Sequence, residues 1–236
     1  MRVLHQELEP PRACPYLEGR LAQHENIVLD HVTDADLEAL LEAGIRHFGP
    51  VYFRPRCGGC AACVSIRVLV DEFAPTRSQR RVLRACEDVR VVVGPPVVDD
   101  ARLALYARWH AAREGQRGWL PAELDERAYG FSFAHPAPSA REFSSWLGDR
   151  LVAVGISDET SGSLSAVYCF HEPDEARRGL GTFNVLSHLA YAREQRKRYV
   201  YLGYWVAGCP SLEYKTRFSP HERLSRGAPR WQRHEG

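Results

Sequence analysis

In the first quarter of the chain, apolar residues follow no clear period up to residue 31 and recur at helical spacing from Thr33 onward. Residues 1–31 contain three prolines and lack a clear apolar period, so we predict loop structure there. A helix is predicted from Thr33, because Thr33 and Asp36 form a capping-box pattern, leucines follow at helical spacing and Gly44 can end it. Residues 51–55 are rich in aromatic and β-branched residues, which indicates a short strand.

A cysteine-rich loop separates that strand from a second block of elements. Residues 64–70 form an apolar run typical of a strand, and a helix with a basic face is predicted from about 78 to 87. Residues 89–93 are a candidate buried strand. Gly94-Pro95-Pro96 then breaks the pattern.

We place a domain boundary at this break. It separates an N-terminal module, residues 1–95, from a second domain, residues 96–236.

The second half of the chain predicts strands with a helix between them. The expected elements are a helix over 99–115, short helices and loops over 116–140, strands from about 143, over 151–157 and over 163–170, a helix over 179–197, a strand over 199–205, and a helix or loop around Pro210 followed by a late strand. A helix that connects two strands in this way crosses over the sheet. The sequence therefore predicts a mixed α/β fold.

Composition limits the class of protein. With 236 residues, 44% hydrophobic and 26% charged, the chain is an ordinary globular protein with one large core or two modest ones. It has no apolar run of membrane-spanning length and no apolar secretion signal at the N-terminus, so we expect a cytoplasmic protein without a membrane partner. Because the net charge is only +1, nucleic-acid binding would need a local basic patch.

Three of the seven cysteines are closely spaced. Cys57, Cys60 and Cys63 on a glycine-rich loop could converge on one zinc ion or iron–sulfur cluster, with Cys14 as the fourth ligand. The alternative is that these thiols are unliganded and pack as small hydrophobic groups. We expect no disulfide framework, since the cysteine count is odd and no secretion signal is present.

An arginine-rich helix face is the first candidate for phosphate binding. The segment 76–84 places arginines at helical spacing, with Ser78 and Gln79 as additional hydrogen-bond donors. The arginines are Arg77, Arg80, Arg81 and Arg84. A solvated helix face without a ligand is the alternative interpretation.

A second candidate lies where the helix over 179–197 begins. Arg178, Gly179 and Gly181 form a turn whose small residues would let backbone N–H groups approach an anion. This short Arg-x-x-Gly turn resembles the pyrophosphate-binding turn of N-acetyltransferase-like folds. A tight turn without a ligand remains the alternative.

The segment 199–220 combines aromatic rings with cations. Tyr204, Trp205 and Tyr214 lie at or beyond the end of a predicted strand, where sites form in α/β proteins, and Lys215 and Arg217 follow. Rings and cations in this order suit the unpaired end of an RNA strand. The tyrosines earlier in the strand, at 199 and 201, are expected in the core.

Together these motifs resemble the bacterial branch of the aminoacyl-tRNA–protein transferases, the aspartate/glutamate leucyltransferases, which are related to the eukaryotic arginyltransferases. The matching segments are CPYLEGR (14–20), YFRPRCGGCAAC (52–63), RSQRRVL (77–83), LSAVYCFHEP (164–173), RRGLGTFNVL (177–186), YLGYW (201–205) and YKTRF (214–218). They cover nearly the whole chain. The short length and the single N-terminal cysteine are more similar to the leucyl branch than to the arginyl branch.

The resemblance implies a small N-terminal α+β module joined to an acetyltransferase-like (GNAT-like) domain. It implies transfer of an amino acid, leucine first, from aminoacyl-tRNA to a protein with N-terminal Asp or Glu, within an N-degron pathway. No cofactor and no covalent intermediate are needed for this aminolysis. We assign catalysis to Lys215, Tyr204 and Tyr214. Binding of substrate and tRNA is assigned to Arg77, Ser78, Gln79, Arg80, Arg81, Arg178, Gly179, Gly181, Trp205 and Arg217.

Three other functions remain open from the sequence alone. The donor could be Arg-tRNA instead of Leu-tRNA. The Arg-x-x-Gly turn would also serve an acyl-CoA-dependent N-acetyltransferase. The cysteine loop and the arginine-rich helix together would suit a non-catalytic, metal-dependent RNA-binding protein.

Overall fold

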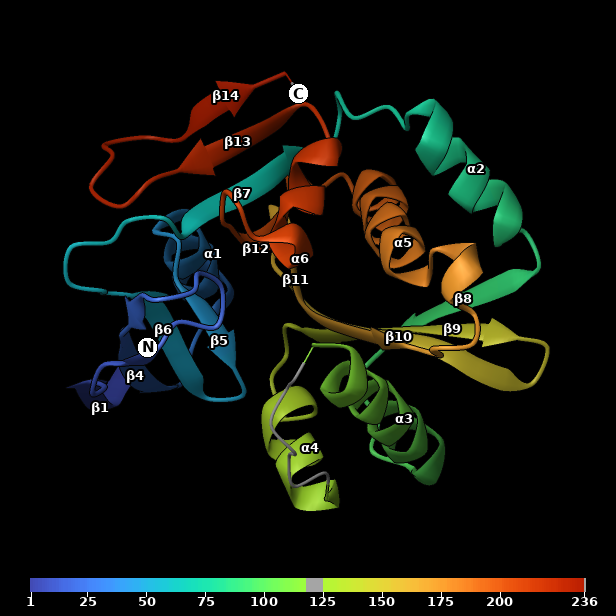
Figure 1. Ribbon diagram of the computed structural model, residues 1–236, viewed down its shortest axis with the longest axis horizontal. Coiled ribbons are helices and arrows are strands. Elements are labelled where there is room, and N and C mark those ends of the chain that lie inside the picture. The colour runs from blue at the N-terminus through green and yellow to red at the C-terminus, as the bar shows by residue number, and fades with distance from the viewer. Residues whose placement is uncertain (118–124, 236) are drawn as a thin grey trace. The chain divides into compact units, whose positions relative to one another are not determined.

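The computed structural model describes residues 1–117 and 125–235 (Figure 1). The chain forms two compact units, each assembled from separate stretches. Unit 1 comprises Met1–Ala74, Thr160–Ser165 and Gln195–Gly236, and unit 2 comprises Pro75–Glu159 and Ala166–Glu194. Both units contain strands and helices, so the mixed α/β prediction is confirmed. The division at residues 95 and 96 stays a prediction, because the compact units follow contacts rather than chain order.

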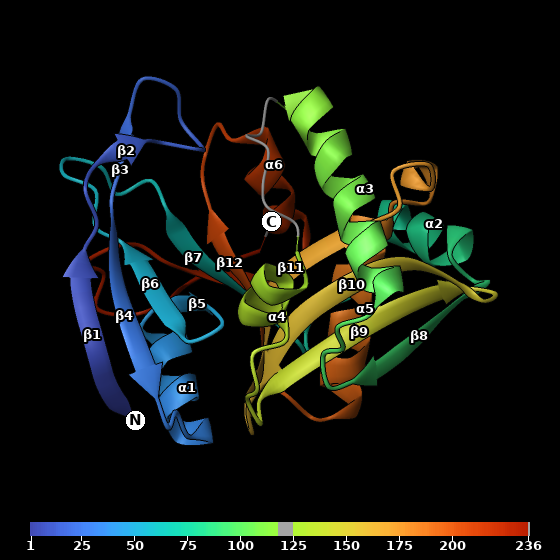
Figure 2. The ribbon, with the colours of Figure 1, turned by 90° about the horizontal axis from the view of Figure 1, so that it is seen from below.

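Unit 1 begins with a four-stranded antiparallel sheet in the order β1-β4-β6-β5 (Figure 2). The strands are β1 (Arg2–Leu8), β4 (His24–Asp30), β5 (Arg46–Phe48) and β6 (Val51–Pro55), and the chain between β1 and β4 contains the short pair β2 (Arg12–Ala13) and β3 (Leu21–Ala22). The prediction of loop structure over 1–31 is therefore wrong. Every residue of β1 is exposed, so the strand is held by backbone pairing with β4 and has no apolar alternation to reveal it.

The first helix, α1 (Asp34–Glu42), confirms the capping-box prediction. Thr33 caps the backbone N–H of Asp36, and the Asp36 carboxylate accepts from the backbone N–H of Thr33 at 3.1 Å. Its leucine stripe enters a core with Leu29, Tyr52 and Tyr201. Tyr201 is therefore a core residue, as expected.

The second sheet of unit 1 carries the elements that matter for function. In unit 1 its strands follow the order β14-β13-β7-β12-β11, in which β7 (Val64–Leu69), β11 (Ser163–His171) and β12 (Tyr199–Trp205) were predicted. Residues 163–165 of β11 belong to unit 1 and the rest of this strand belongs to unit 2. The late strands are β13 (His221–Leu224) and β14 (Gln232–His234), and α6 (Pro210–Glu213) and the 3-10 turn η2 (Tyr214–Arg217) precede them. The first residues of β11 pair with β12 in parallel. The helix α5 (Leu180–Glu194) connects these two strands, which confirms the predicted crossover.

Unit 2 is built on the antiparallel strands β8 (Val89–Gly94), β9 (Ala140–Leu147) and β10 (Arg150–Glu159). Figure 1 shows α2 (Arg77–Ala85) and α5 on one face of these strands, and α3 (Asp100–Arg117) and α4 (Glu126–Phe133) on the other. Part of the segment 116–140 lies outside the described residues, and α4 confirms the helix expected there. The strand β8 was predicted to be buried, but Arg90 and Val92 are exposed, so one of its two faces is open to solvent; among the described strands it lies at the edge of the sheet, paired with β9.

The core on the α2 and α5 face explains why α2 lies where it does. Cys86, which follows α2, packs with Val89, Val152 and Phe183 in one buried cluster. Cys86 is 2% exposed, so this thiol packs in the core. Because its partly apolar side faces this cluster, α2 turns its arginines to solvent.

Candidate functional site

A β-bulge near the end of β12 shapes the candidate site in unit 1. Against β7, Tyr201 is opposite Arg67 and Tyr204 is opposite Ser65, so one extra residue is inserted in β12. Gly203 lies in this insertion with φ 79°, a left-handed conformation that residues with a side chain rarely adopt. Bulges of this kind re-aim the side chains that follow them.

Lys215 lies against this bulge. Its Nζ donates to the backbone oxygen of Tyr204 at 2.7 Å, and the residue is 9% exposed. No carboxylate within the described parts of the chain forms a salt bridge with it. Burial first, and the positive charge of Arg46 second, lower the pKa of Lys215 to about 7. A large share of this amine is therefore neutral at physiological pH.

Arg46 is a member of the site that the sequence did not reveal. It lies on β5, which was not predicted, and is 8% exposed. Its Nη1 donates to Ser165 Oγ at 2.8 Å. A Cβ atom on Gly203 would lie 3.6 Å from the Nε of Arg46 and 3.6 Å from the Nζ of Lys215, so both side chains approach the bulge.

Tyr204 contributes its backbone oxygen and a buried ring. Its hydroxyl donates to the backbone oxygen of Gly44 at 2.9 Å, and burial raises its pKa far above the ordinary value. The phenol therefore stays protonated and holds its place in the fold. Its side chain also lines a cavity of about 360 Å³.

The remaining predicted residues of this segment lie in the same unit. The guanidinium of Arg223, on β13, stacks over the indole of Trp205 at 4.2 Å, a partner that the sequence did not suggest. Tyr214 contacts Phe218 edge to face at 6.4 Å between ring centroids, and Arg217 is exposed. The structure thus gathers the predicted residues 204, 205, 214, 215 and 217 at and beyond the end of β12.

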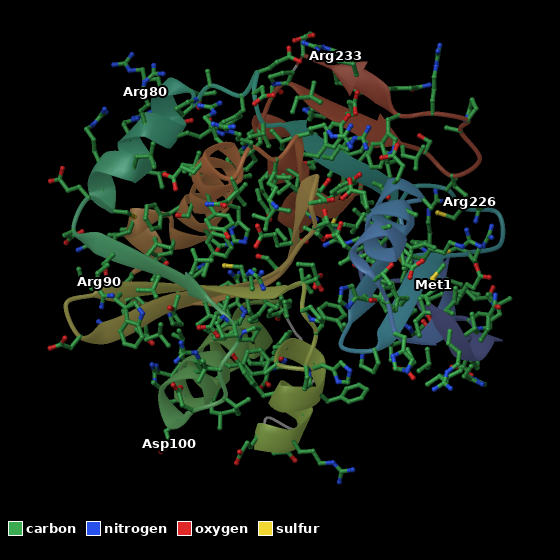
Figure 3. All side chains as sticks on the ribbon, turned by 180° about the vertical axis from the view of Figure 1, so that it is seen from behind. Met1, Arg80, Arg90, Asp100, Arg226 and Arg233 are labelled. Carbon is green, nitrogen blue, oxygen red and sulfur yellow. The ribbon has the colours of Figure 1, made fainter. Side chains whose placement is uncertain are left out.

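The arginine-rich helix of unit 2 presents its cations to solvent. Arg77, Arg80 and Arg81 are exposed, and Figure 3 shows Arg80 extending outward from α2. Gln79 is different: it is 3% exposed, and its Oε1 accepts from the backbone N–H of Thr76 at 2.8 Å. Gln79 therefore completes a capping box. The Ser78 hydroxyl lies 3.1 Å from the Oγ1 of Thr76 in the same cap.

The turn before α5 also belongs to unit 2. Arg178 is held by Asp88 at 2.6 Å and by Glu175 at 2.9 Å, and it also donates to a backbone oxygen of α2. Gly179 has φ 73°, and a Cβ there would approach Val82 to 3.2 Å, so the turn needs glycine both for its conformation and for its packing on α2. Gly181 lies in the first turn of α5, where backbone N–H groups have no partner within the helix.

The cysteine loop brings its thiols near one another in unit 1. Burial first, and then the nearby Cys57, Cys14 and Cys60 thiols, raise the pKa of Cys63 to about 12. Within the described parts of the chain, however, no group of three or more His, Cys, Asp or Glu residues is arranged to hold a metal ion. The Cys57 sulfur instead accepts from the backbone N–H of Gln23 at 3.4 Å. Metal binding by these cysteines stays a prediction.

Comparison with known proteins defines the class. Residues 12–81 match the family described as "Arginine-tRNA-protein transferase, N terminus", and residues 101–225 match the family described as "Arginine-tRNA-protein transferase, C terminus". The protein is an aminoacyltransferase of mixed α/β, GNAT-like fold.

The particular family follows from the matches along the whole chain. The chain is 36% identical over 230 residues to the aspartate/glutamate leucyltransferase of Hahella chejuensis, with 96% of each chain covered. It is 38% identical over 239 residues to the protein of that name from Rhizorhabdus wittichii, with 95% of this chain and 86% of that one covered. The chain belongs to the aminoacyl-tRNA–protein transferase family.

A solved structure shares the fold at low sequence identity. It is the C-terminal domain of a putative lysylphosphatidylglycerol synthetase from Agrobacterium fabrum, with a TM-score of 0.51 and 14% identity over 80% of this chain and 63% of that one. Among the helices that the structure describes, none is long and apolar enough to cross a membrane.

Proposed function

We propose that this protein transfers leucine from Leu-tRNA to the N-terminal Asp or Glu of acceptor proteins and so marks them for degradation through an N-degron pathway. The names of the relatives support this donor and these acceptors. The observation that carries the chemistry is the buried Lys215 amine with a pKa of about 7, held on the Tyr204 backbone oxygen. In this proposal the protein acts in the cytoplasm, the compartment expected from the sequence.

The reaction is an aminolysis of an activated ester. The neutral α-amine of the acceptor attacks the carbonyl carbon that joins leucine to the terminal ribose, and a tetrahedral oxyanion forms. The intermediate collapses as the C–O bond to the ribose breaks, and the attacking nitrogen loses a proton while the ribose oxygen gains one. A peptide bond and a free tRNA hydroxyl result. The α-ammonium has a pKa of about 7.7–8.0, so a useful fraction of the acceptor amine is already neutral at pH 7. After the attack the nitrogen carries a positive charge, and a base is needed to remove its proton.

In this proposal Lys215 is that base. A neutral lysine amine can accept the proton of the attacking nitrogen and then return it to the leaving ribose oxygen. The Tyr204 backbone oxygen orients the Lys215 amine through its 2.7 Å hydrogen bond, and Arg46 favours the neutral form by charge repulsion. Tyr214 precedes Lys215 on the same turn and is assigned to the donor side chain or the terminal adenosine.

The tRNA contacts in this proposal come from two kinds of group. The exposed Arg77, Arg80 and Arg81 provide cations for phosphates, while Trp205 provides a ring for an unpaired base. The backbone at Gly179 and Gly181 is assigned to an anionic group at the start of α5. Ser78 and Gln79 support α2 through its cap, and Arg178 supports the turn through its ion pairs.

The proposed reaction assigns no catalytic role to a metal. If zinc or an iron–sulfur cluster binds, Cys14, Cys57, Cys60 and Cys63 are the proposed ligands. The thiols as they lie do not form a coordinating group, so no step of the reaction is assigned to a metal. Elemental analysis of the purified protein and of a variant with serine at 57, 60 and 63 tests this assignment directly.

One assay separates the proposed function from its alternatives. Purified protein is given Leu-tRNA, Arg-tRNA or acetyl-CoA, each labelled on the transferable group, with peptides that begin with Asp, Glu, Lys or Ala. We expect label only from Leu-tRNA and only on the Asp and Glu peptides. Label from Arg-tRNA would assign an arginyltransferase, and label from acetyl-CoA an N-acetyltransferase. Equal binding of charged and uncharged tRNA with no labelled peptide would indicate a non-catalytic RNA-binding protein.

A further inference from the structure

The cavity that Tyr204 lines is surrounded by arginines that no part of the proposed mechanism uses. It has a volume of about 360 Å³ and belongs wholly to unit 1. Four of its lining residues are Arg54, Arg56, Arg226 and Arg230. They come from β6, from the start of the cysteine loop and from the connection between β13 and β14.

The connection between β13 and β14 is a fixed loop. Gly227 has φ 82°, and the backbone N–H of Ala228 donates to the oxygen of Ser225 at 3.0 Å, which closes a tight turn. Arg226 donates to the backbone oxygen of Cys57 at 2.9 Å. Past the turn, the Trp231 Nε1 donates to the backbone oxygen of Glu42 at 3.0 Å. The loop is thus tied down on both sides, and Arg226 and Arg230 are kept at the cavity.

The charges around the cavity do not cancel. Among the described residues that line the cavity, Glu42 is the one with a carboxylate, and this carboxylate already forms an ion pair with Arg67. Arg54 and Arg56 use only their Nε atoms on Glu25, at 2.6 and 2.9 Å. Their terminal nitrogens each keep two N–H groups for another partner. The cavity therefore has an excess of positive charge and of hydrogen-bond donors, which favours an anionic ligand.

The size and the rings of the cavity favour one kind of anion. A volume of about 360 Å³ is far larger than a carboxylate and lies in the range, roughly 300–1,000 Å³, of pockets that hold whole small molecules. Guanidinium groups bind phosphate oxygens in pairs, and Trp231 adds an aromatic residue to the lining, which suits a sugar or base. A nucleotide unit satisfies all three features.

We infer that this cavity binds a backbone phosphate of the tRNA, together with the nucleoside beside it. The identity of the RNA rests on the proposed function, whereas the chemistry of the ligand rests on the cavity itself. Phosphate could also be supplied by a free nucleotide, which an experiment can distinguish from an RNA strand.

Binding of uncharged tRNA, which involves no catalysis, tests this inference. The test variant replaces Arg226 and Arg230 with alanine, and a second variant replaces both with lysine. The control is Arg196→Ala, which removes an exposed arginine of the same unit that does not line the cavity. Fluorescence anisotropy gives the Kd over a series of salt concentrations, and thermal unfolding checks that each variant is folded.

The salt dependence is the decisive quantity. Each phosphate contact contributes about 0.7–0.9 to the slope of log Kd against log salt concentration. We expect the alanine variant to lose at least one such increment and to bind tRNA about 10-fold more weakly at low salt. The lysine variant should keep most of the slope, and Arg196→Ala should match the wild type.

Each contrary result has a defined meaning. An unchanged slope in the alanine variant, with a wild type that binds tRNA, overturns the cavity assignment and leaves the proposed function standing. Binding of AMP that is lost in the variant while tRNA binding persists would assign the cavity to a free nucleotide. A raised KM for an Asp-peptide alone would assign it to a carboxylate. Arginine-dependent tRNA binding without leucine transfer overturns the proposed function only.

Discussion

Two nitrogen bases, one in each unit, are similarly buried but differ in their capacity to exchange a proton. In unit 2, His188 on α5 is 0% exposed and stacks on Phe143 at 3.9 Å. Its Nδ1 lies 2.6 Å from the Asn184 backbone oxygen, an acceptor, so Nδ1 carries the proton and Nε2 accepts from the Ser157 hydroxyl. In unit 1, Lys215 is buried to a similar degree and donates to one carbonyl oxygen.

His188 and Lys215 differ in how many further hydrogen bonds each side chain can form. Burial lowers the pKa of His188 to about 4 and is the largest cause that lowers the pKa of Lys215 to about 7. His188 has both ring nitrogens occupied, so it can neither give nor take a proton without breaking the core. Among the described residues the Lys215 amine has one hydrogen-bond partner, so it can form further hydrogen bonds, and it contacts Tyr204, which lines a cavity. A shifted pKa therefore indicates a functional group only where that group can still exchange a proton with a ligand.

The largest expected effect is the loss of catalysis at Lys215. Lys215→Arg keeps a cation but cannot release its proton, and Lys215→Met keeps the approximate shape without a base. We expect kcat/KM for leucine transfer to fall by about 10²–10⁴ in both variants, with tRNA affinity little changed. In the wild type, kcat/KM should rise with pH through about 7 as the amine becomes neutral. Rates within a few-fold of the wild type would remove Lys215 from the reaction.

The second effect is acid sensitivity that originates at His188. The folded-state pKa of about 4 lies below the ordinary value of about 6.5, so protonation favours the unfolded chain. This contribution to stability is complete above about pH 6.5 and is lost as the pH falls toward 4, by about 3 kcal/mol. Urea unfolding of the wild type and of His188→Asn from pH 7 to pH 4 measures it. Equal pH dependence in the two proteins would contradict a neutral, buried His188.

The smallest effect is a gain in stability when Lys215 is removed. Its folded-state pKa of about 7 lies below the ordinary 10.5, so near pH 7 burial of the amine costs on the order of 4 kcal/mol, a cost that vanishes above about pH 10.5. Lys215→Met also leaves the Tyr204 oxygen without its donor, a loss of about 1–3 kcal/mol. We expect a net increase of about 2 kcal/mol in the free energy of unfolding at pH 7, measured with urea. A less stable variant would show that the lysine is held for structure.

Much of the secondary structure could be predicted because it depends on local patterns. The cap at Thr33, the arginine face of α2 and the strand β12 with the turn that follows it are all specified by neighbouring residues. The predicted residues 204, 214 and 215 of unit 1 also lie within one short segment, so they are close in space mainly because they are close in the sequence. The strands β1 and β4 could not be found in this way, because backbone pairing across a long separation holds the exposed β1.

The sequence by itself determined which chemical groups this protein has, in which local elements they lie and which family it resembles. Only the tertiary structure decided what each group can do. It buried Lys215 beside Arg46, occupied Arg178 with two carboxylates, and collected Arg54, Arg56, Arg226 and Arg230 around one cavity. The physical reason is that pKa values, ion pairs and cavities depend on residues distant in the chain, and no local pattern encodes those distances.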